Sequence, residues 1–287
     1  MKILNFGSIN KDLVYLVDDF VKPGQTISSN SHEIFLGGKG LNQSVAIARA
    51  GSKIHHAGAI NKDDDYIIRT LKKWGVETSN INYVDKSTGH AIIQVDKRGE
   101  NSIIICGGAN QCIDNNHIEE TLSSFSSGDY ILLQNEINNI NEIINRAYNK
   151  GIKIIFNPAP YSNNVQDYCL EKIDTLIYNE TEGESLSGKK DKFDIVGELS
   201  SRYPKTKQLI TLGKKGSLYF FENKTIEVRA KKINTVDTTA AGDTYIGYYI
   251  SSISKEKSVK ESMQIASRAA AISTTKLGGA TSIPTLN

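Results

Sequence analysis

Four apolar runs divide the second half of the chain at regular intervals. Each has the length of a buried strand, and they cover residues 130–133, 152–156, 174–178 and 208–212. The segments between them space apolar residues three and four positions apart, which predicts helices with one buried face, and they cover 141–149, 181–186 and 193–202. Strands that alternate with helices predict a mostly parallel sheet with helices on both faces.

The N-terminal part of the chain combines this pattern with a different one. It predicts a buried strand, a helix opened by Gly-Gly-Lys-Gly and ended by Gly51, a second strand and a second helix, at 2–8, 37–51, 53–60 and 63–74. Residues 13–36 and 89–106 instead read as extended, with a turn at Pro23-Gly24 and a polar hairpin at 96–101. These two segments predict a small β-sheet that projects as a lid. No repeat or linker is visible, so we expect one domain, 1–287, with the lid segments inserted in it.

Composition excludes several classes of protein. The net charge is +2, from 34 basic and 32 acidic residues, so there is no electrostatic reason to expect nucleic acid or an anionic membrane as a partner. No stretch approaches the roughly 18 apolar residues of a membrane helix, and no signal peptide is visible. Cys106, Cys112 and Cys169 form no Cys-x-x-Cys pair, which indicates a reduced, cytoplasmic protein.

Polar residues gather where the predicted strands end. They are Asn10, Asp12, Glu136, Asn157, Asn179, Glu182 and Thr211. In open α/β sheets, ligands bind beyond the carboxyl ends of the strands. One such residue would be unremarkable as a signal, but the repetition at successive strands predicts a site at this edge.

The segment from Asp237 to Asp243 is a run of small residues between two carboxylates, and a helical pattern begins where it ends. Small residues let a ligand approach the backbone, and the free N–H groups at a helix start attract anions. Asp243 could then take a proton from a hydroxyl that attacks a phosphate. An N-terminal Asp could equally serve as a helix cap, and the segment alone leaves both interpretations open.

Two phosphate-binding motifs can be rejected. Residues 183–190 match G-x-x-x-x-G-K but have Lys190 where a Walker motif requires Ser or Thr, and they follow a helical pattern instead of a strand. Residues 37–42 lack the G-x-G-x-x-G spacing of a dinucleotide site.

Taken together, an ordered series of short motifs resembles the ribokinase branch of the PfkB carbohydrate kinases. The series runs through 7–12, 23–26, 37–42, 108–110, 157–160, 179–182, 211–213 and 237–243. The resemblance covers nearly the whole chain. It implies a ribokinase-like three-layer α/β/α sandwich, with a central mostly parallel sheet and a small β-sheet lid.

The resemblance also implies roles for the residues at the predicted site. Asp243 matches the catalytic base, and Ala240, Ala241 and Gly242 match an anion hole made of backbone N–H groups. The ATP-binding positions are Asn179, Thr211, Gly213, Gly216, Gly242 and Ser267, with a loop at Gly278 and Gly279 near the adenine. Glu182 matches the residue that holds Mg²⁺ through water, and capping of a helix by Asn179 and Glu182 can coexist with that role.

The sugar-binding positions implied by the resemblance are Asn10, Asp12, Gly38, Lys39, Asn42, Ala91, Ile105 and Glu136. A polar residue at Asn10 suits a sugar that carries a 2-hydroxyl. Oxygen ligands for an activating K⁺ align with Asp237, Thr239, Ser273, Gly278 and Ser282. The resemblance further implies a homodimer joined through the lids.

The sequence therefore predicts an ATP-dependent sugar kinase with Mg²⁺ as cofactor, which converts D-ribose to ribose 5-phosphate. A PfkB-type kinase of another sugar or of a nucleoside is the first alternative. A non-catalytic sugar- or nucleotide-binding regulator is the second, although such a protein would have no need of the base Asp243.

Overall fold

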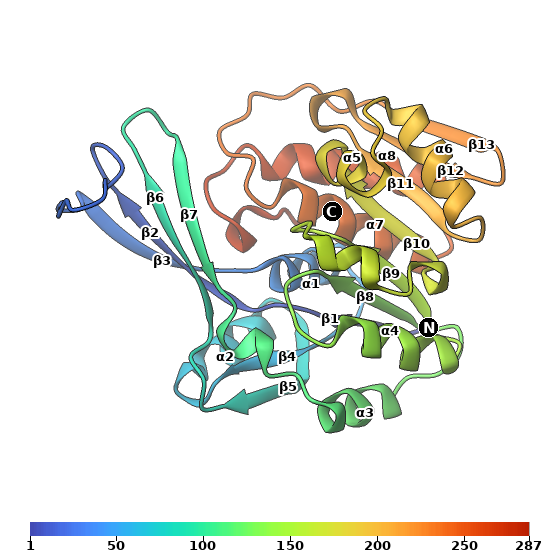
Figure 1. The fold of residues 1–287 in the computed structure, drawn as a ribbon, viewed down its shortest axis with the longest axis horizontal. Helices are drawn as coiled ribbons and strands as arrows, with labels where there is room; N and C mark the ends of the chain where they lie inside the picture. The colour runs from blue at the N-terminus through green and yellow to red at the C-terminus, as the bar shows by residue number, and fades with distance from the viewer. Residues whose placement is uncertain (287) are drawn as a thin grey trace.

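The computed structural model describes residues 1–286, and within them two sheets are formed (Figure 1). The strands are β1 (Ile3–Phe6), β2 (Asn10–Leu16), β3 (Ser31–Gly37), β4 (Ile54–Asn61), β5 (Val76–Val84), β6 (Gly89–Val95), β7 (Asn101–Cys106), β8 (Tyr130–Gln134), β9 (Lys153–Asn157), β10 (Thr175–Asn179), β11 (Lys207–Thr211), β12 (Ser217–Phe221) and β13 (Lys224–Val228). The larger sheet has the order β13-β12-β11-β10-β9-β8-β1-β4-β5, and the smaller has the order β3-β2-β6-β7. From β5 to β11 the larger sheet is parallel, and β12 and β13 pair antiparallel at its edge.

Helices cover both faces of the larger sheet. They are α1 (Lys39–Arg49), α2 (Tyr66–Lys73), α3 (Asn115–Ser123), α4 (Ile140–Asn149), α5 (Glu180–Ser187), α6 (Lys192–Arg202), α7 (Ala241–Ser254) and α8 (Val259–Ser273). Buried residues of α3 to α6 form one apolar cluster with the sheet, and those of α1, α2, α7 and α8 form another. The three-layer α/β/α sandwich predicted from the sequence is therefore confirmed. None of the helices in residues 1–286 is long and apolar enough to span a membrane.

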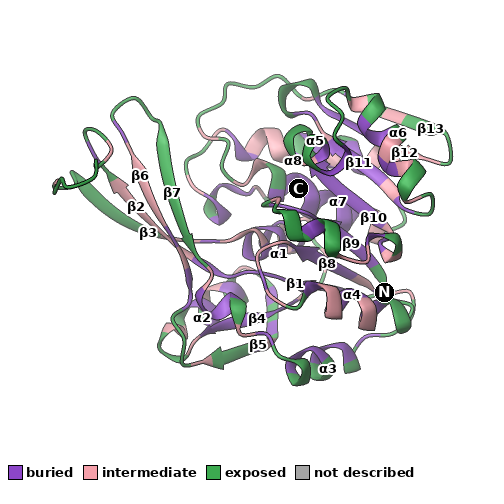
Figure 2. Cartoon of the chain, in the orientation of Figure 1, coloured by how far each residue is buried: buried purple, intermediate pink, exposed green. Residues whose placement is uncertain are grey.

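The small sheet projects from the body of the protein, as Figure 1 shows. Its strands are mostly exposed or half-buried, in contrast to the buried central strands (Figure 2). Its strands lie in the two segments that the sequence indicated, 13–36 and 89–106, except that β2 begins earlier, at Asn10, and β3 ends at Gly37. Residues 17–30, which were also predicted to be extended, form no strand. Because β2 follows β1 after three residues, the small sheet joins the larger one at the carboxyl end of β1.

Five helices and strands lie in segments for which no element was predicted from the sequence. They are β5, α3, β12, β13 and α8. The β12–β13 hairpin turns at Glu222 and Asn223, whose φ angles of 48° and 58° are those of a tight hairpin turn. This turn usually carries Asn-Gly, so the Glu-Asn pair gave a weak signal. The edge strands β12 and β13 make the sheet mostly, and not wholly, parallel.

Candidate active site

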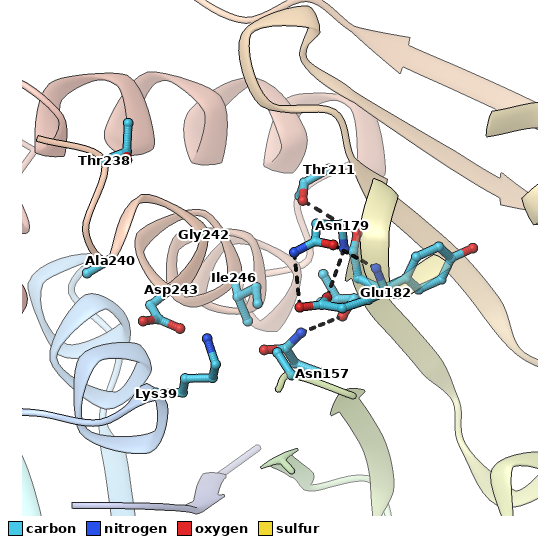
Figure 3. A pocket seen from close by; sticks show the side chains of 13 residues that line it. Lys39, Asn157, Asn179, Glu182, Thr211, Thr238, Ala240, Gly242, Asp243 and Ile246 are labelled. Atoms are coloured by element: carbon cyan, nitrogen blue, oxygen red, sulfur yellow. Dashed lines mark hydrogen bonds between the residues drawn. The ribbon is translucent and has the colours of Figure 1, made fainter. Parts of the chain in front are cut away.

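Four neighbouring strands end in polar residues at one edge of the larger sheet. Glu136 follows β8, while Asn157, Asn179 and Thr211 end β9, β10 and β11. A cavity of about 260 Å³ opens here (Figure 3), and it is lined by Lys39, Asn157, Ala159, Ile177, Tyr178, Asn179, Glu182, Thr211, Thr238, Ala240, Gly242, Asp243 and Ile246. The structure thus brings the start of α7 against the strand ends that the sequence singled out.

The first turn of α7 forms one wall of the cavity. Ala240 precedes the helix with a left-handed φ of 58°, a backbone conformation that is costly for a residue with a side chain and that accumulates at functional sites. The first N–H groups of a helix have no partner within it, so they are available to an anion. The N–H of Ala241 already donates to Thr238 O at 3.2 Å, whereas a Cβ at Gly242 would meet nothing within 4 Å. The space beside Gly242 is therefore free for an anion to approach the helix start.

Asp243 is 8% exposed and is held by two amides of α1. Asn42 Nδ2 donates to its Oδ2 at 3.1 Å, and Gln43 Nε2 donates to its Oδ1 at 2.8 Å. The side chain points into the cavity toward Lys39 (Figure 3). Asp243 does not cap α7 through a side-chain hydrogen bond, and the residue at the cap position is Ala240. The carboxylate therefore accepts from α1 and faces the cavity, and it does not cap its own helix.

Lys39 lies at the start of α1 and points into the same space as Asp243 (Figure 3). Burial by itself would lower the pKa of Lys39, but the charges of Asp243, Glu136 and Glu182 outweigh it and raise the pKa above its usual value. The ammonium group is therefore firmly protonated. A fixed positive charge between these carboxylates is suited to an anionic group transferred across the cavity.

Asn179 and Glu182 form a capping box at the start of α5. Asn179 Oδ1 accepts from Glu182 N at 2.9 Å, and Glu182 Oε2 accepts from Asn179 N at 3.0 Å. Burial raises the pKa of Glu182, against the opposing effects of the Asn179 N–H and the charge of Lys39. Each carboxylate oxygen of Glu182 keeps a free lone pair beside the cavity. A single carboxylate of this kind fits a Mg²⁺ ion that retains most of its water.

The first strand end holds two further polar residues of the predicted sugar site. Asn10 Oδ1 accepts from Asn110 Nδ2 at 2.8 Å, and Asn110 Oδ1 accepts from Ile9 N at 3.0 Å. A Cβ at Gly89 would lie 2.2 Å from Asn110 Nδ2 and 2.3 Å from Asn10 Oδ1, so the amide pair requires glycine beside it. Asn10 is consequently fixed with its Nδ2 group free to donate elsewhere.

Asp12 lies two residues further along β2 and is half-buried. Burial raises its pKa to about 6, and the charges of Glu136 and Asp243 add to this effect. Burial likewise raises the pKa of Glu136, whose Oε2 accepts from Ser8 Oγ and from Lys39 N, the latter at 2.9 Å. The carboxylates of Asp12, Glu136 and Asp243 thus lie near one another. Acceptors at this density suit a ligand with several hydroxyl groups.

Other predicted sugar positions lie on the small sheet and at the start of α1. Ala91 pairs with Asp12 on one side and with Ile105 on the other, so all three share one face of the small sheet. Ala91 is 6% exposed and Ile105 is 57% exposed. Gly38 has a φ of 90° and precedes Lys39. Of the eight predicted sugar positions, only Lys39 lines the 260 Å³ cavity.

The predicted nucleotide positions are spread more widely. Thr211 lines the cavity, and Gly213 and Gly216 follow it in a turn with φ angles of 52° and 114°. A Cβ at Gly216 would lie 2.0 Å from Val228 O, so only glycine fits there. Ser267 is buried in α8 and does not line the cavity.

The residues predicted to bind K⁺ include a compact group around Asp237. Its Oδ1 accepts from Thr239 N at 2.8 Å and Thr239 Oγ1 at 2.7 Å, and its Oδ2 accepts from Gly278 N at 2.9 Å. Ser273 and Ser282 are buried, and each hydroxyl donates to a nearby backbone carbonyl. Within residues 1–286 there is no cluster of three or more His, Cys, Asp or Glu side chains that could hold a metal ion.

Sequence reasoning missed Gln43 and Gln134. Both are fully buried, and Gln134 Nε2 donates to Gln43 Oε1 at 2.7 Å behind Asp243. Gln43 follows Asn42, three residues after the Gly-Gly-Lys-Gly segment, and Gln134 ends the apolar run of β8. A glutamine at the carboxyl end of a buried parallel strand was the signal that could have identified Gln134.

An aspartate and a lysine face a helix start that contains glycine, at the strand ends of a ribokinase-like sandwich. This arrangement is that of a phosphotransferase that uses a nucleotide. A family model described as "pfkB family carbohydrate kinase" matches residues 1–286. The chain belongs to the PfkB family of carbohydrate kinases, and it is an ATP-dependent enzyme of that family.

Several relatives are similar over nearly their full length. A ribokinase of Haemophilus influenzae is 37% identical over 290 residues, which is 97% of this chain and 94% of that protein. A deoxyribokinase of Salmonella typhi is 32% identical over 303 residues, with 100% and 96% covered. The structure of an Arabidopsis thaliana ribokinase complexed with ribose and ATP superposes with a TM-score of 0.87 at 28% identity, covering 99% of this chain and 95% of that one.

Proposed function

We propose that the protein transfers the γ-phosphoryl group of ATP to the primary hydroxyl of D-ribose. The observation that carries this proposal is the position of Asp243. Asp243 lines the cavity that contains Glu182, and it is close enough to Asp12 of the first strand end for its charge to raise the pKa of Asp12. The ribokinases among the relatives, and the neighbour with ribose and ATP, support this choice of substrates.

In this proposal Asp243 takes the proton of the sugar's 5-hydroxyl as the hydroxyl oxygen attacks the γ-phosphorus. The bond between the γ-phosphorus and the bridging oxygen of ATP breaks, and ADP leaves with the electron pair. Asn10, Asp12, Asn42 and Glu136 bind the remaining hydroxyls, with Ala91 and Ile105 of the small sheet against the less polar side of the sugar. The N–H groups of Ala240, Ala241 and Gly242, together with the Lys39 ammonium, stabilise charge on the transferred group. Phosphoryl transfer depends mainly on such positioning and charge neutralisation.

Glu182 would hold Mg²⁺ through water, and the ion would neutralise charge on the ATP phosphates. The nucleotide would be contacted by Thr211, Gly213, Gly216 and Asn179, and Ser267 would lie near the adenine of ATP. We also propose K⁺ as an activating ion, with ligands from Asp237, Thr239, Ser273, Gly278 and Ser282. The chain would act as a single domain in a cytoplasmic homodimer, with the small sheets covering the sugar sites and joining the protomers.

The deoxyribokinases among the relatives make 2-deoxyribose the main competing acceptor. The polar Asn10, with its Nδ2 group free to donate, favours ribose. An ADP-release assay with ribose, 2-deoxyribose, fructose and adenosine as acceptors tests the proposal. The highest kcat/KM is expected with ribose, and a higher value with any other acceptor would replace ribose as the substrate.

A further inference from the structure

A chain of buried amides connects Asp243 to the interior of the protein. Gln43 Nε2 donates to Asp243 Oδ1 at 2.8 Å, and Gln43 Oε1 accepts from Gln134 Nε2 at 2.7 Å. The same Gln134 Nε2 donates to Asn5 Oδ1 at 3.0 Å. Asn5, Gln43 and Gln134 are all 0% exposed. Amides in such surroundings keep one arrangement because water cannot replace a lost partner.

The neighbours of this chain fix the direction of every amide in it. Asn5 Nδ2 donates to Gly40 O at 2.7 Å and to Ser44 Oγ at 2.8 Å, so Asn5 Oδ1 must face Gln134. A reversed Gln134 would set its oxygen against Asn5 Oδ1 and Gln43 Oε1, which are both acceptors. Gln43 must therefore turn its carbonyl to Gln134 and its NH₂ group to Asp243.

Close packing of two helices holds Gln43 against Asp243. A Cβ at Gly247 of α7 would lie 2.3 Å from Ala46 Cβ and 2.9 Å from Gln43 O of α1. The absence of a side chain at Gly247 thus lets α1 approach α7 one turn after Asp243. The Gln43 amide also donates to Asn157 Oδ1 at 3.2 Å, which ties the pair to the end of β9.

We propose that Gln43, oriented by Gln134, is a positioning residue that fixes the carboxylate plane of Asp243 for proton abstraction. This inference rests on the proposed function, in which Asp243 is the base. Asn42 holds one carboxylate oxygen and Gln43 holds the other. Each oxygen then retains one lone pair for the sugar hydroxyl. Without Gln43, the carboxylate can rotate about the Cβ–Cγ bond of Asp243, and the reacting oxygen loses its defined position.

The variant Gln43→Leu tests the inference, with Gln208→Leu as a matched control. Gln208 is also a fully buried glutamine of the core, and its Nε2 donates to Thr206 O at 3.2 Å, within its own strand region. Misplacement of a reacting group by about 1 Å costs on the order of 10²-fold. We expect kcat to fall roughly 30- to 100-fold in Gln43→Leu, while KM and the calorimetric Kd for the sugar change less than about threefold. The control should keep the wild-type kcat. An unchanged kcat in Gln43→Leu, or an equal loss in Gln208→Leu, would overturn the inference.

A double-mutant cycle separates positioning of the base from general loosening of the core. If Gln43 acts through Asp243, then adding Gln43→Leu to Asp243→Asn should lower kcat no further. A further loss of the full single-variant size would contradict it. Should Gln43→Leu not fold, as judged by circular dichroism, Gln134→Leu removes the donor that orients Gln43, and an unchanged kcat there would also refute the inference.

The assays use whichever sugar the wild-type protein phosphorylates fastest. A failure of ribose as substrate therefore leaves the test of Gln43 intact. Full activity in Asp243→Asn would refute the proposed role of Asp243 as the base. Full activity in Gln43→Leu, with Asp243→Asn inactive, would refute only the positioning role of Gln43.

Discussion

Replacing Asn10 by methionine tests which sugar hydroxyl the first strand end recognises. Asn10 is 5% exposed, and Asn110 holds its Oδ1 at 2.8 Å, so the Nδ2 group is the one left to donate to a ligand. A 2-deoxy sugar would leave this N–H group without a partner in a closed site. Methionine removes the N–H group and fills the space of the missing hydroxyl, so preference should move from ribose toward 2-deoxyribose.

The size of the effect follows from the cost of an unpaired buried polar group. That cost is about 1–3 kcal/mol, which corresponds to roughly 5- to 150-fold in kcat/KM. Ribose should lose kcat/KM in the variant because its 2-hydroxyl would lie against a thioether. The substitution also removes the partner of Asn110 Nδ2, so the melting temperature should fall by several degrees, at about 2–4 °C per kcal/mol.

The assay is the ratio of kcat/KM for ribose to that for 2-deoxyribose, measured by ADP release. The wild-type protein should favour ribose by about tenfold or more, and Asn10→Met should reduce that ratio by at least as much. Asn110→Leu is the control: it also breaks the Asn10–Asn110 hydrogen bond but keeps the Asn10 amide, so its ratio should shift less. An unchanged ratio in Asn10→Met would show that Asn10 does not recognise the 2-hydroxyl.

Three further predictions concern charge, ions and assembly. The pKa of Asp12 is raised to about 6, so its contribution to stability is present below its usual pKa and is lost as the pH rises through 6. Asp12→Asn should therefore raise the melting temperature more at pH 8 than at pH 5. A larger gain at pH 5 would contradict this pH dependence. Potassium should raise kcat well above its value in sodium, and equal rates in potassium, sodium and a bulky organic cation would exclude the K⁺ site. Ile103 and Ile104 are 49% and 62% exposed on opposite faces of β7, and we expect them to contact a second protomer. Light scattering at micromolar concentration should show a dimer for the wild-type protein and a monomer when both residues are changed to lysine. A monomeric wild-type protein would rule the dimer out.

The sequence predicted the sandwich because its central strands are apolar throughout and are separated by amphipathic helices. Short, wholly apolar runs such as β8 and β9 are typical of buried parallel strands, so their sequence indicates this structure directly. Strand β5 lies at the sheet edge, where exposed and buried residues alternate along much of it. Because its exposed positions are polar, it was not recognised as a strand from the sequence. Edge elements bury less apolar surface, so their local sequence carries less information about them.

The strand ends could be read as a site because parallel strands finish at one edge of the sheet. The relation of Gln43 to Asp243 could not be read in this way, because the two residues are 200 positions apart and meet only where α1 packs on α7. The same holds for Lys39, whose place beside Asp243 and Glu182 depends on three separate elements. Local patterns identify such residues as unusual, but only tertiary packing determines which of them meet.

The most direct test of the account compares turnover and binding in Asp243→Asn. This change keeps the shape of the side chain and removes its capacity to take a proton. We predict that kcat with ribose falls about 10²–10⁴-fold, while the calorimetric Kd values for ribose and for ATP stay within a few fold of the wild type. A variant that retains near-wild-type kcat would contradict the central claim that Asp243 is the base of a sugar kinase.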